Sequence, residues 1–177
     1  MKTDVKKLVL SGVFLALGMV LPFLTMQVPY IGNMLLPMHI PVLLCGFICG
    51  APYGIIVGLI TPLLRSVIFS VPKLFPMACG MAFELASYGF LTGFLYKLFK
   101  KQKEGSRIYL SLFLAMLGGR LVWAIAANFF YKLAGMEFTM EVFLAGGFIN
   151  AVPGIILQLI IIPIIVLALK KAGVINE

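Results

Sequence analysis

Long apolar runs without charged residues are the feature that most limits how this chain can fold. Residues 8–25 and 144–169 each contain no charged side chain. A helix rises ~1.5 Å per residue and needs ~20 residues to cross the hydrocarbon core of a bilayer. Because 62% of the chain is hydrophobic and 11% is charged, against about one half and one quarter in soluble domains, we expect lipid to be the solvent.

The runs are apolar on all sides, whereas strands of a membrane β-barrel alternate in polarity over about ten residues. The sequence therefore predicts an all-α integral membrane protein, a compact bundle of six transmembrane helices in one domain over residues 1–177. The helices are expected at about 8–25, 35–50, 53–70, 74–97, 108–132 and 144–169.

The first apolar run also raises the alternative of a cleaved signal peptide, because Lys2, Lys6 and Lys7 precede it. No cleavage pattern of small residues follows it at 25–27, and further spans come after it. A secretory signal would show that pattern. We therefore expect a retained first helix.

Three clusters of basic residues predict the orientation of the bundle. They are Lys2, Lys6 and Lys7; Lys97, Lys100, Lys101, Lys103 and Arg107; and Lys170 and Lys171. Six crossings put all three clusters on one side, which the positive-inside rule makes the cytoplasm. Both termini are expected there. The net charge of +8 then reflects topology and anionic lipid, and no nucleic-acid partner is expected.

The connections on the two sides differ in kind. On the outer side, 25–34 and 135–141 are candidate lids. On the inner side, a two-residue turn at 51–52 lies among glycines that recur at every fourth position. These are Gly46, Gly50, Gly54 and Gly58. Small residues at this spacing let helix backbones approach closely. No inverted repeat is evident, which argues against a secondary transporter built from duplicated halves.

Two charged residues, Glu84 and Arg120, are expected near the middle of the membrane. Glu84 lies about 15 Å into the fourth helix and Arg120 about 18 Å into the fifth, at 1.5 Å per residue. A charge at that depth costs at least ~2.5–3.5 kcal/mol on insertion scales. One interpretation is a structural ion pair. The other is a functional site, with Glu84 as the counter-charge of an Arg120 that binds substrate.

Polar side chains on the last two helices extend this candidate site. Gln158 lies at a similar depth, and Asn128 and Asn150 lie about two turns nearer the outer surface. The alternative for these amides is hydrogen bonding between helices. Trp123, one turn beyond Arg120, is a candidate for stacking on a planar ligand, or simply a core residue.

Arg65 and His39 lie near the outer ends of the third and second helices. They complete the candidate substrate-binding set. The alternative is that each side chain reaches up to the membrane interface.

No constellation for catalysis or metal binding is found. Cys45, Cys49 and Cys79 fall within apolar runs and are expected to be small packing residues. The chain has one histidine and no glycine-rich phosphate loop or paired acidic protease motif. We therefore expect no catalytic residue, no metal, no cofactor and no ATP hydrolysis by this chain.

The segment 46–54, with its Gly-Ala-Pro-Tyr-Gly turn, and the spacing Gly12-x-x-x-Ala16 carry a resemblance to a known family. Over its whole length the chain resembles the S-components of energy-coupling factor (ECF) transporters, which capture vitamins in bacteria and archaea. The resemblance implies that Gly12 and Ala16 dock on a transmembrane T-component and that two cytoplasmic ATPases drive uptake. It also implies a plasma-membrane location and a pocket in the outer half of the fourth to sixth helices.

The expected substrate is a water-soluble vitamin or precursor. The basic residues Arg65, Lys73 and Arg120 suit an anionic or strongly polar ligand. Pantothenate therefore ranks first, ahead of pyridoxine-like, folate-like and cobalamin-precursor ligands. Two other classes remain open: a self-sufficient proton-coupled transporter that titrates Glu84, and a membrane scaffold that transports nothing.

Overall fold

The computed structural model describes residues 2–26 and 34–173, and every regular element within them is helical. The elements are α1 (Lys2–Met26), α3 (His39–Cys49), α4 (Ala51–Phe69), η1 (Leu74–Ala78), α5 (Cys79–Leu98), α6 (Glu104–Leu133), α7 (Met140–Leu144), η2 (Ala145–Ile149) and α8 (Val152–Lys171). The short element η2 is a π-helical turn, whereas η1 is a kinked segment in which Phe75 is extended, with φ −123° and ψ 133°.

Five helical stretches are long and apolar enough to cross a membrane. They are Val5–Phe23, Ala51–Phe69, Leu74–Leu98, Glu104–Leu133 and Ala145–Lys171. The predicted all-α membrane bundle is therefore confirmed. The expected lid at 25–34 falls largely on residues 27–33, which lie outside the described residues.

The second helix is shorter than expected. Its predicted range was 35–50, but α3 spans 11 residues, which is about 16 Å at 1.5 Å per residue. That length covers about half of a ~30 Å hydrocarbon core. The reason lies at Leu36, which precedes Pro37 and has a φ of 48°. A φ of 48° lies in the left-handed region, which a right-handed helix cannot include, so α3 begins after this residue, at His39.

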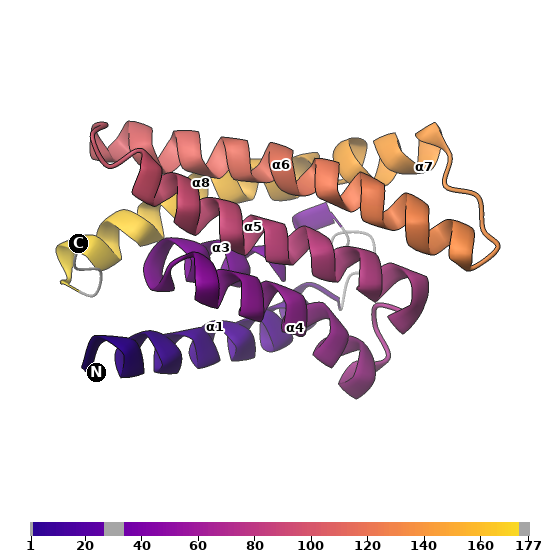
Figure 1. The fold of residues 1–177 in the computed structure, drawn as a ribbon, viewed down its shortest axis with the longest axis horizontal. Coiled ribbons are helices and arrows are strands. Elements are labelled where there is room, and N and C mark those ends of the chain that lie inside the picture. The colour runs from indigo at the N-terminus through magenta and orange to yellow at the C-terminus, as the bar shows by residue number, and fades with distance from the viewer. Residues whose placement is uncertain (1, 27–33, 174–177) are drawn as a thin grey trace.

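The arrangement of the helices follows the expected up-and-down order (Figure 1). Both ends of the described chain and the link between α5 and α6 lie at the left end of the view, while the links α4–α5 and α6–α7 lie at the right end. The three basic clusters therefore belong to one end of the bundle. That this end faces the cytoplasm is a prediction from the positive-inside rule.

The close approach predicted from the spaced glycines is confirmed between α4 and α5. A Cβ atom built on Gly54 or Gly58 of α4 would overlap backbone atoms of α5, and one on Gly89 would overlap Gly54. Gly46 of α3 likewise leaves no room for a Cβ against α5. Gly50 differs, because nothing lies near it. Its φ of 94° is a conformation that glycine adopts without steric cost.

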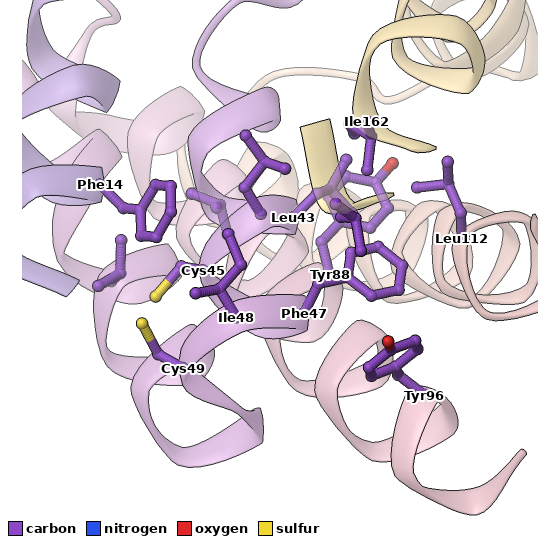
Figure 2. Packing of buried hydrophobic residues seen from close by; sticks show 14 of the residues in the cluster. Phe14, Leu43, Cys45, Phe47, Ile48, Cys49, Tyr88, Tyr96, Leu112 and Ile162 are labelled. Carbon is purple, nitrogen blue, oxygen red and sulfur yellow. The ribbon is translucent and has the colours of Figure 1, made fainter. Parts of the chain in front are cut away.

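Helix α3 lies at the centre of the buried core, packed against α1, α4, α5 and α8. Cys45 and Cys49 are fully enclosed in the hydrophobic cluster, as expected for small packing residues. Figure 2 shows both sulfur atoms on the side of α3 where Phe14 of α1 lies, with Phe47 and Tyr96 on the other side. The rings of Phe47 and Tyr96 meet edge to face at 5.3 Å.

A cluster of polar side chains ties α5, α6 and α8 together near the basic end. Lys170 Nζ donates to Glu104 Oε2 at 2.6 Å, and the Tyr96 hydroxyl donates to Glu104 Oε1. Arg107 Nε donates to the Tyr96 carbonyl at 2.6 Å, and its guanidinium lies 3.7 Å from the Tyr96 ring centroid. These contacts join three helices at the basic end, while the cavity described next lies toward the other end of α5 and α6.

Candidate substrate-binding site

A buried ion pair joins α5 and α6. Arg120 Nη1 donates to Glu84 Oε1 at 2.7 Å, and the side chains are 7% and 2% exposed. The Tyr88 hydroxyl, one turn along α5, donates to the same oxygen at 3.1 Å. The pairing expected from helix depth is therefore present. Burying either charge alone would be costly, whereas the pair satisfies both.

His39 of α3 completes this cluster. Its Nε2 lies 3.7 Å from Glu84 Oε1, and its ring centroid lies 5.5 Å from that of Tyr88. The residue is 2% exposed, so it does not extend to the membrane interface. Neither ring nitrogen has a hydrogen-bond partner among the described residues. Buried polar atoms usually have partners, so these two enclosed nitrogens leave the hydrogen-bonding capacity of His39 unused.

A cavity of about 430 Å³ opens beside this cluster, between α3, η1, α5, α6 and η2. Its size falls within the ~300–1,000 Å³ range of small-molecule sites. Its polar lining includes His39, Glu84, Arg120, Tyr131 and Asn150. The rest of the wall is mostly apolar. Part of the lining can thus form hydrogen bonds, and the remainder can cover apolar groups.

Arg120 presents unused donors to the cavity. Among the described residues its hydrogen-bond partner is Glu84, which Nη1 reaches. The unpaired nitrogens of Arg120 are not fully buried. A guanidinium carries five N–H donors in a rigid fork. Because the side chain lines the cavity, the remaining N–H groups are open to a ligand.

Trp123 lies in an aromatic cluster at one side of the cavity. The ring of Phe143 stacks on that of Trp123 with 6.1 Å between the centroids, and the ring of Phe138 lies edge to face with a centroid distance of 5.7 Å. A Cβ built on Gly147 would come within 3.2 Å of the indole, so η2 also packs closely on it. Neighbouring side chains therefore cover much of the indole ring, and Trp123 contributes to the cavity as part of its wall.

A scan against protein-family models matches residues 6–166 to the family described as the ECF transporter substrate-specific component. The match covers most of the chain. The protein belongs to the ECF transporter substrate-specific components, or S-components. Searches of curated proteins and of solved structures each find no match. The resemblance inferred from the sequence is thus confirmed, and the chain is a multi-pass membrane subunit of a transporter.

Five of the eight residues predicted to bind substrate in this S-component line the cavity together. They are His39, Glu84, Arg120, Trp123 and Asn150. Arg65 lies elsewhere: it donates from Nη1 to the Met19 carbonyl at 2.6 Å, and its guanidinium lies 5.0 Å from the Phe23 ring. It is 1% exposed, so it does not reach the interface either. Arg65 joins α4 to α1.

Asn128 and Gln158 do not line the cavity of the S-component. Asn128 is half-buried, and its neighbour Ala127 lines the cavity in its place. A spacing of eight residues leaves Asn128 about 80° away from Arg120 around the helix. Gln158 is 1% exposed, and its phase differs from that of Asn150 because η2 ends in a turn at 150–151. This break in the helix therefore separates Asn150, at the end of η2, from Gln158 on α8.

Sequence reasoning missed Tyr88 and Tyr131 as parts of the site. A signal for both was present. Tyr88 follows Glu84 by one turn, and Trp123, Ala127 and Tyr131 follow Arg120 at intervals of three, four and four residues. Residues at such intervals share one face of a helix, so the stripe that begins at Arg120 leads to Tyr131.

Proposed function

We propose that this S-component captures a small water-soluble vitamin or vitamin precursor in the cavity beside Glu84 and Arg120, with pantothenate as the first candidate. One observation carries the proposal. The guanidinium of Arg120 is fixed by Glu84 at 2.7 Å and also lines a cavity of about 430 Å³. A ligand carboxylate or carbonyl can accept charge-assisted hydrogen bonds from its unused edge.

The rest of the lining supports a ligand of mixed polarity. Asn150 and Tyr131 supply an amide and a hydroxyl, while Met77, Met81 and Trp123 supply apolar surface. Pantothenate has a carboxylate, an amide, two hydroxyls and a methylated carbon, which matches this pattern. It therefore ranks ahead of pyridoxine-like, folate-like and cobalamin-precursor ligands.

Uptake in this proposal needs a transmembrane T-component and two cytoplasmic ATPases in the plasma membrane of a bacterium or archaeon. The exposed face of α1, away from the rest of the bundle, supports docking. Gly12 and Ala16 are exposed there, and nothing lies within 4 Å of a Cβ built on Gly12. Small residues on an exposed helix face favour close helix–helix contact. Glu84 is engaged by Arg120 and Tyr88, which disfavours a proton-coupled transporter that titrates it.

Mass spectrometry of ligand that co-purifies with the protein tests the proposal, together with thermal unfolding against a panel of B vitamins and their precursors. A ligand present at 100 times its Kd stabilises the native state by about 2.7 kcal/mol, so the unfolding temperature should rise with one panel member. Arg120→Ala should lose this rise, whereas Lys101→Ala, in the link between α5 and α6, should retain it. A folded protein that no panel member stabilises would contradict vitamin capture.

A further inference from the structure

The charges around the cavity are balanced before any ligand arrives. Glu84 and Arg120 form a 1:1 ion pair, and with a neutral His39 the lining holds no further charged side chain. A ligand with one carboxylate would therefore leave one net negative charge in a mostly buried site. A buried charge without compensation is strongly disfavoured. The site needs a further positive charge to hold an anion.

His39 is the group in the lining that can supply this charge. An imidazole takes up a proton near neutral pH, and both of its nitrogens then become donors. Both nitrogens of His39 lack a hydrogen-bond partner among the described residues. Its Nε2 already lies at ion-pair distance, 3.7 Å, from Glu84 Oε1.

The other titratable groups near His39 leave this role to it. Glu84 and Tyr88 approach it from α5, and Arg120 and Tyr131 share the cavity from α6. The helices α1, α4 and α8 also pack against α3. In the part of the chain that the structure describes, they add no charged side chain to the cavity lining.

We propose that this site binds a monoanionic ligand together with one proton, and that His39 carries the proton. The inference rests on the proposed function and names the ligand class of the same site. A protonated His39 shares the charge of Glu84 with Arg120, so part of the guanidinium charge becomes available to the ligand. The proton comes from water, and the net charge of the occupied site returns to zero.

Two measurements on the purified wild-type protein test the inference. The first is calorimetric titration with pantothenate, or with whichever anionic vitamin of the panel stabilises the protein, in buffers of different ionisation enthalpy. We expect uptake of about one proton per ligand above neutral pH, and hence about a tenfold loss of affinity per pH unit there. The second is nitrogen NMR of the imidazole, which is unambiguous because the chain has a single histidine. We expect His39 to be doubly protonated in the complex.

A matched ligand and a matched variant serve as controls. Pantothenyl alcohol lacks the carboxylate of pantothenate and should bind without proton uptake. His39→Gln keeps a hydrogen-bonding side chain that cannot be charged at neutral pH. It should bind pantothenate at least tenfold more weakly and with no pH dependence, while thermal unfolding shows whether the variant is folded.

The other outcomes distinguish failure of this inference from failure of the proposed vitamin capture. Pantothenate binding without proton uptake, or with a neutral imidazole in the complex, overturns the inference and leaves vitamin capture standing. So does the finding that the panel ligand is uncharged. If no panel member binds the folded protein, both proposals fall.

Discussion

Glu84 accepts hydrogen bonds from Tyr88 and Arg120 through one oxygen, and His39 lies 3.7 Å from the same atom. A single carboxylate thus links α3, α5 and α6 at the wall of the cavity. Because an ion in the membrane interior costs at least ~2.5–3.5 kcal/mol without a partner, the position of Glu84 depends on Arg120, and that of Arg120 on Glu84. Substitutions can separate the role of this ion pair in stability from the role of Arg120 in ligand binding.

Glu84→Gln should destabilise the protein, because it leaves Arg120 buried without a counter-charge. Removing one partner of a buried pair costs about 3–5 kcal/mol. Arg120→Lys should keep the charge and the fold but lose the guanidinium fork. We expect its ligand affinity to fall roughly 10- to 100-fold, the equivalent of one charge-assisted hydrogen bond of about 1.5–3 kcal/mol.

Thermal unfolding and ligand titration of both variants beside the wild type check this prediction. If Arg120→Lys binds ligand as well as the wild type does, Arg120 is a structural cation. The ligand would then have to be held by other polar residues of the cavity lining, such as Tyr131 and Asn150.

At the scale of elements, the contact between α4 and α5 depends on glycine at three positions. A Cβ on Gly89 would overlap the backbone of Gly54, and backbone cannot move aside as a side chain can. Gly89→Val should therefore lower the free energy of unfolding by about 3 kcal/mol or prevent folding, at or above the upper end of the ~1–3 kcal/mol found for overpacked cores. Gly12→Val is the control, since nothing lies within 4 Å of its Cβ. Equal unfolding temperatures would contradict the close packing.

Helix α1 presents the second element-scale prediction. Gly12→Phe or Ala16→Phe should leave ligand binding in detergent unchanged and abolish uptake in cells, because a bulky side chain would hold a docking helix away. Leu121→Trp on the exposed face of α6, where Leu121 is 64% exposed, is the matched control and should transport normally. Normal uptake by both α1 variants would exclude this face as the docking surface.

At the scale of the whole molecule, the chain is a substrate-specific component without an ATP-binding signature of its own. Proteoliposomes that contain this chain alone should therefore accumulate no vitamin, even with a proton gradient imposed. Those that also contain the T-component and both ATPases should accumulate it when ATP is present on the ATPase side. Accumulation by the chain alone that a protonophore abolishes would instead support a proton-coupled transporter.

The sequence by itself determined the helical membrane bundle and the close approach around the glycines, and it suggested the pairing of Glu84 with Arg120 that the structure shows. The physical reasons are local. The length and hydropathy of a run decide whether it can cross lipid, and the fixed rise of a helix converts sequence distance into depth. Two opposite charges buried at equal depth on consecutive helices are therefore expected to form an ion pair.

Only the tertiary structure decided which other polar residues join that pair. The bend at Leu36 shortens α3 and leaves His39 beside Glu84, and the turn after η2 separates Asn150 from Gln158. Arg65, which the sequence also offered, lies against α1. Depth along a helix can be computed from sequence, but the direction of a side chain depends on each break in the helix and on which neighbours pack against it, and those are set only when the whole bundle assembles.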